Sequence, residues 1–242
     1  MGRLVHISMA GIDEHTDLDG LKRLQAMDPR VEFGVLISAK WQENGNRYPN
    51  PEWLENLKGM KLNLSAHLCG SIAREAIHNN WQPTLKLLGD YAALFKRVQL
   101  NIARYTSKSL NTLNLNVSEP FEEAIIQQKA SYDCRLFYDW LLEHPEDPSI
   151  SVLIDGSGGL GMEKKLIPLC GAPKVGYAGG IGPENVYEKA KELFLNENVE
   201  DFWVDMESKV RTDDWFDLNK AEKVIQQVNL AQHIVTMNGF VD

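Results

Sequence analysis

Eight short apolar runs recur along the chain, separated by longer amphipathic segments, and this alternation constrains the fold more than any other feature. A strand followed by a helix, repeated eight times in about 240 residues, is the pattern of a single (β/α)8 TIM barrel of the α/β class. An open doubly wound sheet uses the same alternation, usually with fewer strands. We therefore expect residues 1–242 to form one barrel domain. The predicted strands are Leu4–Ser8, Val31–Ser38, Leu62–His67, Arg97–Ile102, Ala124–Gln128, Ser151–Asp155, Val175–Ala178 and Phe202–Met206.

Helical periodicity fills most of the intervals between these runs. Residues Tyr105–Phe121, after the fourth run, are poorly periodic and rich in Asn and Leu, so we expect a long loop there with at most one helix. The predicted helices are Asp17–Met27, Pro51–Leu57, Ser71–Asn79, Cys134–Glu143, Pro183–Leu195 and Leu218–Ile234.

Charge and composition limit the classes of binding partner that the sequence suggests. The formal net charge of −9 disfavours broad binding to nucleic acid or anionic membranes, which select for basic surfaces. Three widely spaced cysteines suggest a reducing compartment, and no signal peptide or 18-residue apolar run is visible, so a cytoplasmic location is expected. The histidines form no cluster with carboxylates at metal-ligand spacing, and no dinucleotide fingerprint follows the first run. We expect no metal and no cofactor; oligomeric state has no readable signal.

The turn around Gly179 and Gly180 is the strongest indication of a ligand. It follows the seventh run, and Pro183 then opens a helical pattern in the position where a missing N–H costs nothing. Glycines let a backbone come close to a ligand, and a helix start offers unpaired N–H groups to an anion. The turn therefore predicts a binding site for a small anionic ligand, most often a phosphate.

In a barrel the residues that follow each strand meet at one face, where such enzymes keep their chemistry. We therefore expect Ser8, His67, Asn101, Asp155 and Asp205 to share this face, with Asn101 and Asp205 contacting a substrate. Other polar residues at the strand ends are Lys40, Ser65, Cys69, Arg104, Gln128, Lys129, Glu207, Ser208, Lys209 and Arg211.

Several of these residues have a structural interpretation beside the catalytic one. Asp155 can cap the turn that follows it, or it can act as an acid if burial raises its pKa. His67 can be a hydrogen-bonded core histidine or a general base. Lys129 can be a solvated charge or a Schiff-base lysine. Cys69 is expected to be an inert buried thiol, because nothing near it in sequence would lower its pKa.

The second half of the chain resembles phosphoribosylanthranilate isomerase, a tryptophan-biosynthesis barrel that performs an Amadori rearrangement. Val152–Asp155 with Gly158–Gly161 resembles that family's sixth-strand aspartate and glycine-rich loop. Ala178–Val186 is similar to its seventh-strand phosphate loop, and Val204–Ser208 to its eighth-strand turn. A fainter match is Arg47 in the loop after the second run. The clear part covers residues 151–210, and the first half matches mainly in strand order.

The resemblance implies an isomerase that converts a phosphorylated aldose-amine to a ketose-amine by acid–base catalysis. It implies that Asp155 is the general acid and that Arg47 clamps a substrate carboxylate. The implied phosphate-binding residues are Gly158, Gly159, Gly179, Gly180 and Ser208.

Two departures from the family pattern bear on the activity. The family's base is a cysteine at the end of the first strand, where this chain has Ser8 or Ala10. His67 is the replacement base that we expect, which predicts that it faces Asp155 across the barrel mouth. Glu207 stands where a small hydroxyl residue is expected, and would repel a phosphate unless Lys209 or Arg211 compensates.

Three functions remain open from the sequence. The first is an isomerase of this type acting on a phosphorylated sugar derivative. The second is a barrel with other chemistry on a related ligand, in which Lys129 or Cys69 takes part. The third is a protein that binds a phosphorylated metabolite and has lost turnover with the base.

Overall fold

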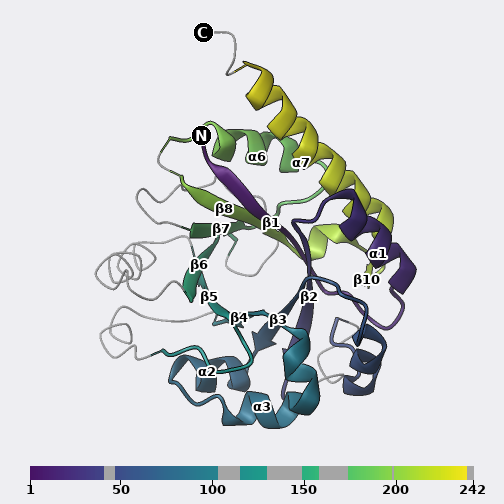
Figure 1. Cartoon of the computed structure of the whole chain (residues 1–242), viewed down its shortest axis with the longest axis vertical. Coiled ribbons are helices and arrows are strands. Elements are labelled where there is room, and N and C mark those ends of the chain that lie inside the picture. Colours follow the sequence, from purple (N-terminus) through teal and green to yellow (C-terminus); the bar gives the residue numbers. More distant parts are fainter. Residues whose placement is uncertain (41–46, 103–114, 130–148, 158–173, 198, 239–242) are drawn as a thin grey trace.

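A computed structural model shows eight parallel strands that close into a barrel in the order β1 to β8 (Figure 1). It describes residues 1–40, 47–102, 115–129, 149–157, 174–197 and 199–238. All eight predicted strands are present, and the predicted (β/α)8 TIM barrel is confirmed. The strands are β1 (Arg3–Ala10), β2 (Val31–Ser38), β3 (Leu64–Cys69), β4 (Arg97–Asn101), β5 (Glu123–Lys129), β6 (Ile150–Asp155), β7 (Lys174–Ala178) and β8 (Asp201–Met206).

The barrel closes where β1 pairs in parallel with β8. The register places Ser8 opposite Asp205 and Met9 opposite Met206, with an irregularity between Leu4 and His6. Because side chains alternate between the two faces of a strand, this register directs Ser8 and Asp205 to the same side, the barrel interior. The first and last strands of the barrel therefore bring Ser8 and Asp205 together inside it.

The helices agree with the predictions in part. The described helices are α1 (Leu18–Met27), α2 (Ser71–Ile77), α3 (Gln82–Leu88), α6 (Val186–Phe194) and α7 (Leu218–Asn238), with 3-10 turns η2 (Pro51–Leu57), η3 (Gly89–Leu94) and η4 (Ser208–Val210). A short hairpin of β9 (Arg211–Thr212) and β10 (Trp215–Phe216) follows β8. The sequence analysis missed α3 and η3. The predicted helix Cys134–Glu143 and most of the predicted loop Tyr105–Phe121 lie outside the described residues.

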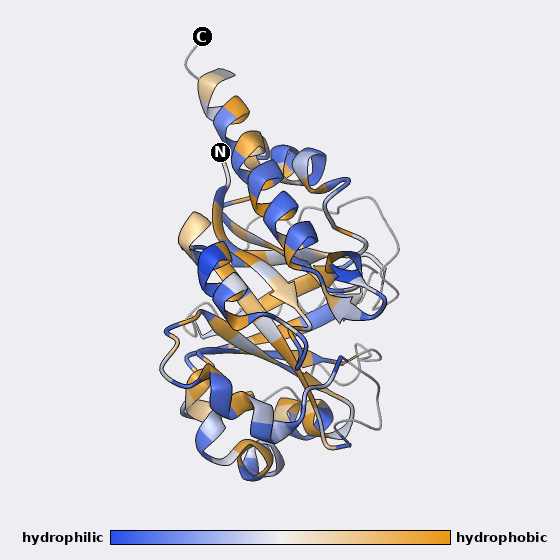
Figure 2. Cartoon of the chain, turned by 90° about the vertical axis from the view of Figure 1, so that its right-hand side faces the viewer, coloured by the Kyte–Doolittle hydropathy of each residue, from blue (hydrophilic) through white to orange (hydrophobic). Residues whose placement is uncertain are grey.

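Side-chain caps explain where two helices begin. The Asp17 carboxylate accepts from the backbone N–H groups of Asp19 and Gly20, at 3.1 and 3.2 Å, and so starts α1. Asp217 accepts from Asn219 N and Lys220 N at the start of α7 in the same way. In Figure 2 the helices carry many hydrophilic residues, whereas the strands behind them are largely hydrophobic. None of the described helices is both long and apolar enough to cross a membrane.

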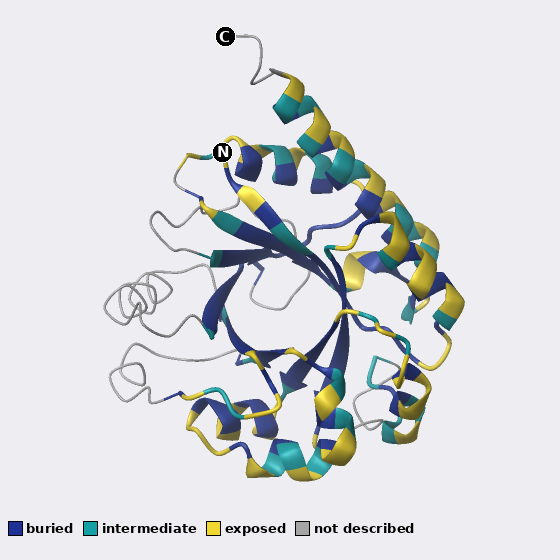
Figure 3. Cartoon of the chain, viewed as in Figure 1, coloured by how far each residue is buried: buried dark blue, intermediate teal, exposed yellow. Residues whose placement is uncertain are grey.

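Apolar side chains form two clusters, one outside and one inside the ring of strands. The large cluster lies between strands and helices, and the strands are almost entirely buried (Figure 3). The small one consists of Ile125, Leu153, Ala178 and Trp203. Gly176 makes room for it, because a Cβ there would come within 2.1 Å of the Trp203 ring and 2.6 Å of Leu153. The Trp203 indole therefore fills the barrel only because β7 has no side chain at this position.

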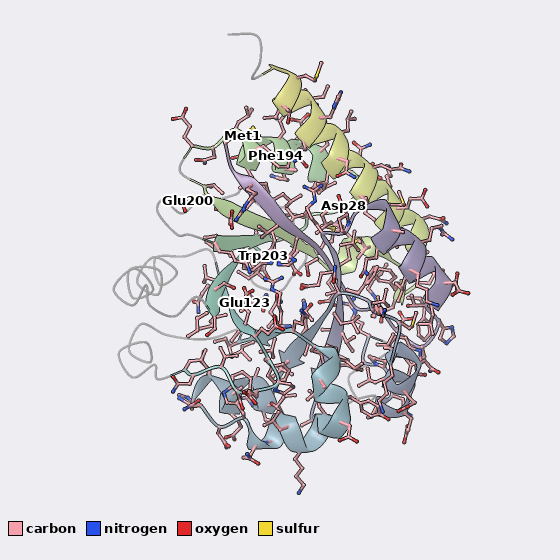
Figure 4. All side chains as sticks on the ribbon, viewed as in Figure 1. Met1, Asp28, Glu123, Phe194, Glu200 and Trp203 are labelled. Carbon is pink, nitrogen blue, oxygen red and sulfur yellow. The ribbon has the colours of Figure 1, made fainter. Side chains whose placement is uncertain are left out.

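Below the apolar cluster lies a network of buried ions centred on Arg97. The Arg97 guanidinium donates to Glu32 Oε1 at 3.0 Å and to Glu123 Oε2 at 3.1 Å. Lys174 Nζ also donates to Glu123, at 2.5 Å, and the guanidinium lies 4.7 Å from the Trp203 ring centroid. Figure 4 shows Glu123 and Trp203 inside the ring of strands. Burial of charge is tolerated here because each ion has a partner of opposite charge on another strand of the barrel.

We predict that Gly176→Ala lowers the free energy of unfolding by about 1–3 kcal/mol, because the added methyl group overpacks the barrel interior. The measurement is urea unfolding followed by far-ultraviolet circular dichroism. In a Trp203→Leu background the same substitution should cost clearly less, since the clashing ring is gone. Equal costs in the two backgrounds would show that Trp203 is not the neighbour that matters.

Candidate active site

A cavity opens at the carboxyl ends of the strands, over the ion network. Its walls come from residues in the middle and at the carboxyl ends of β3 to β8, and from the loops after β6, β7 and β8. This is the face at which (β/α)8 barrels carry their active sites. The residues that line it are His67, Gln99, Asn101, Gln127, Asp155, Ser157, Ala178, Gly179, Gly180, Ile181, Asp205, Met206, Glu207, Ser208 and Lys209.

Most predicted site residues lie in or next to this cavity. Seven line it: His67, Asn101, Asp155, Gly179, Gly180, Asp205 and Ser208. Ser8 lies against Asp205 and is 1% exposed. Arg47 is not part of the lining but contacts Glu207, which is. Gly158 and Gly159 lie outside the described residues, as does the side chain of Lys129.

Asp155, the last residue of β6, holds the turn that follows it while it also lines the cavity. Its Oδ1 accepts from the backbone N–H and the hydroxyl of Ser157, at 2.8 and 2.7 Å. Its Oδ2 accepts from Gln127 Nε2 at 2.8 Å. The structural interpretation of this residue is therefore supported, because Asp155 caps the turn after β6; its carboxyl group also lines the cavity.

Asp205 is a buried carboxyl group with one strong hydrogen bond. Ser8 Oγ donates to its Oδ1 at 2.7 Å. Burial raises the pKa of Asp205 to about 7, against the Ser8 hydrogen bond, and the nearby carboxylates of Glu207, Glu32 and Asp155 add to the rise. A carboxyl group with a pKa near neutrality can exchange a proton with a ligand at physiological pH.

His67 is fixed in place and hard to protonate. Its Nε2 lies 3.1 Å from Ser65 Oγ, and Gly34 on β2 leaves room for the ring, because a Cβ there would lie 2.6 Å from Nε2. Burial lowers the pKa of His67 to about 4, while Glu32 opposes and Arg97 adds to this shift. The histidine does line the same cavity as Asp155, but a pKa this low makes its imidazole a weak base at neutral pH.

An amide-rich wall on β4 and β5 contains two lining residues that the sequence analysis missed, Gln99 and Gln127, beside the predicted Asn101. Gln99 Nε2 donates to Asn101 Oδ1 at 2.9 Å, and Asn101 Nδ2 donates to Cys69 Sγ at 3.4 Å. Burial raises the pKa of the Cys69 thiol, which agrees with its interpretation as an inert residue. The alternation of polar residues along β4, from Arg97 through Gln99 to Asn101, could have identified this wall, because these positions share the inner face.

The loop after β7 is built by glycines and by one asparagine. Gly179 and Gly180 have φ angles of +108° and +67°, where side chains are strained. A Cβ on Gly179 would also lie 2.9 Å from the N atoms of Gly156 and Ser157. Asn185 closes the loop: its Oδ1 accepts from Gly182 N and its Nδ2 donates to Gly180 O. These bonds hold the intervening residues in a turn.

The predicted start of the helix after this loop is therefore wrong. The sequence analysis placed Pro183 in the first helical position, but α6 begins at Val186. Residues 183–185 instead form the turn that the Asn185 side chain closes. A proline can occupy such a turn as readily as a first helical turn, which is why its presence did not distinguish the two.

Glu207 is neutralised by an arginine that the sequence analysis assigned to another role. Arg47 Nη1 donates to Glu207 Oε1 at 2.6 Å, and Arg47 Nε donates to Asp214 Oδ1 at 2.8 Å. Arg211, one of the expected counterions, makes its closest ion pair with Asp13: its Nη2 lies 3.1 Å from Asp13 Oδ2. Lys209 lines the cavity and makes no ion pair with any described residue.

We predict that Asp205→Asn stabilises the protein at alkaline pH. The folded-state pKa of Asp205, about 7, is above the unfolded value of 3.8, so the folded state binds more protons between these values. Its contribution to stability is present at low pH and is lost as pH rises through 7. We would measure the free energy of unfolding in urea at pH 5 and at pH 8.5. Relative to the wild type, the value for the variant should increase by a few kcal/mol between the two pH values. A difference independent of pH would refute the raised pKa.

Comparison with solved structures finds barrels of similar fold. TrpF from Jonesia denitrificans superposes with a TM-score of 0.57 at 12% identity, over 94% of this chain and 98% of that one. N-(5'-phosphoribosyl)anthranilate isomerase from Pyrococcus furiosus gives 0.55 at 16% identity, over 93% and 99%. A phosphoribosylanthranilate isomerase in complex with reduced 1-(o-carboxyphenylamino)-1-deoxyribulose 5-phosphate gives 0.52 at 17% identity, over 95% and 99%. No family model and no curated protein sequence matches. The chain is a (β/α)8 barrel similar in fold to these phosphoribosylanthranilate isomerase structures.

Proposed function

We propose that the cavity binds a phosphorylated aldose-amine and isomerises it to the ketose-amine. One observation carries this proposal: two carboxyl groups, Asp155 and Asp205, line the same cavity as a glycine turn suited to phosphate. The similar structures include one with a ribulose 5-phosphate derivative bound. Such a rearrangement needs an acid, a base and a phosphate anchor, and no redox cofactor.

The phosphate end of the ligand is assigned to β7 and β8. The left-handed backbone of Gly179 and Gly180 suits a turn that presents N–H groups to an anion. Ser208 and Lys209 line the cavity beside it, and the Lys209 Cβ would touch a side chain at Gly182, so the two loops are in close contact. The Arg47–Glu207 ion pair removes the repulsion that Glu207 would exert on a phosphate.

Asp155 and Asp205 divide the proton transfers. Asp155 gives a proton to the ring oxygen as the C1–O bond opens, which leaves a protonated imine. Asp205 then removes the proton from C2 to form an enolamine, and protonation at C1 with loss of the O2 proton gives the ketone. Asp205 takes the role of base because its Ser8 partner lies near the end of the first strand, and the similar family has its cysteine at the end of that strand.

A binding protein without turnover is the second candidate. Three hydrogen bonds to Asp155 hold its carboxyl group in the turn after β6, as in a purely structural cap. In that case a phosphorylated ligand binds tightly and leaves unchanged.

The glycosylamine formed by aniline and ribose 5-phosphate tests the isomerisation. We expect enzyme-dependent formation of the C2 ketone in carbon-13 NMR spectra, and a loss of at least about 100-fold in kcat/KM for Asp155→Asn and for Asp205→Asn. Binding of this compound without a ketone signal would favour the second candidate.

The pH dependence tests Asp205 as the base. The rate kcat/KM should rise with pH through about 7 as this carboxyl group ionises. Ser8→Ala removes a hydrogen bond that favours the carboxylate, so the rise should move to higher pH. Ser65→Ala, next to His67, is the matched control and should leave the profile in place. If Ser65→Ala shifts the profile and Ser8→Ala does not, the base is His67.

Lys209 tests the phosphate end. Lys209→Ala should weaken the binding of ribose 5-phosphate roughly tenfold in calorimetric titration, because it removes a charge-assisted contact. Lys86→Ala, on an exposed position of α3 outside the barrel, makes the same change of charge and should have no effect. If the two variants bind ribose 5-phosphate with equal affinity, Lys209 does not contact the phosphate.

A further inference from the structure

The orientation of the ligand follows from the proposed phosphate end. In a closed eight-stranded barrel, β3 and β4 lie across from β7 and β8. A ligand whose phosphate lies at Gly179 and Gly180 therefore directs its other end towards the wall that contains His67, Gln99 and Asn101. In an aldose-amine this other end is the group attached to the nitrogen.

This wall has a hydrogen-bond acceptor with no partner. Gln99 is 3% exposed, and its Oε1 makes no hydrogen bond in the described part of the chain. Its Nε2 donates to Asn101 Oδ1, and Asn101 Nδ2 donates in turn to Cys69 Sγ. A buried carbonyl oxygen without a donor is costly to leave unsatisfied. A ligand that supplies an N–H group removes this cost.

The same end of the cavity is unfavourable for a carboxylate. Among the described lining residues the cation is Lys209, which lies at the phosphate end. Arg47 is held by Glu207 and Asp214, and Arg97, below the cavity, is held by Glu32 and Glu123. A ligand carboxylate at this wall would find no unpaired cation among the described lining residues.

We infer that the substituent on the sugar nitrogen carries N–H donors, such as a carboxamide, and no carboxylate, with Gln99 as the residue that selects it. This inference rests on the proposed function. It separates the ligand from the o-carboxyphenylamino compound bound in the similar structure, and it makes Arg47 a structural counterion instead of a carboxylate clamp.

Two non-reactive ligands that differ in one group test this inference. They are the reduced adducts of ribulose 5-phosphate with anthranilate and with 2-aminobenzamide, whose ring substituents are a carboxylate and a carboxamide of nearly equal size. In calorimetric titration the carboxamide adduct should bind at least about tenfold more tightly. Equal affinities, or tighter binding of the carboxylate adduct, would overturn the inference and leave the proposed function intact. If the protein is folded and neither adduct binds, the inference and the proposed function are both overturned.

Substitutions of Gln99 assign the selectivity to one atom. Gln99→Leu removes the acceptor and should abolish most of the preference for the carboxamide adduct. Gln99→Glu keeps an acceptor and should further weaken the binding of the carboxylate adduct. Gln128→Leu is the matched control, because Gln128 is a buried glutamine of β5 that does not line the cavity. The Gln128→Leu variant should prefer the carboxamide adduct as strongly as the wild type does. A preference that survives both Gln99 substitutions would also overturn the inference.

Discussion

The ion network around Arg97 is the constraint on which the interior of this barrel depends. Arg97 joins Glu32 of β2 to Glu123 of β5, and Lys174 of β7 reaches the same glutamate. Each member is buried or half-buried, so removing one partner would leave a charge without compensation. The network therefore sets how the inner faces of these strands meet, and the cavity lies above it. Burial next to these charges lowers the pKa of His6, as of His67, to about 4, so the interior holds its histidines neutral.

Two arginines organise the mouth of the barrel in a similar way. Arg211 is bound by the Asp13 carboxylate and by backbone oxygens of Gly11 and Asp214, which ties the loop after β1 to the hairpin after β8. Arg47 ties the loop after β2 to Glu207. Both contacts join segments on either side of the β1–β8 closure, where Ser8 meets Asp205. The proposed base therefore lies in a part of the mouth that two arginines hold together.

The alternation of strands and helices was enough to predict the barrel, because eight strand-like runs leave few other architectures. It also predicted that His67, Asp155 and Asp205 would share one face. The pairing of Arg47 with Glu207 was not predictable, because it joins residues 160 positions apart through side-chain conformations. The contrast between a raised pKa at Asp205 and a lowered one at His67 depends on burial, which sequence order does not report. The role of Asn185 was hidden because Pro183 suits a turn and a helix start equally.

The central claim is that Asp155 and Asp205 act on opposite sides of one sugar whose phosphate lies at the β7 loop. A crystal structure with the reduced aniline adduct of ribulose 5-phosphate tests it most directly. The account predicts the phosphate at Gly179, Gly180 and Lys209, with C1 and C2 of the sugar between the two carboxyl groups. A phosphate bound at another part of the mouth, or a sugar out of reach of Asp205, would contradict it.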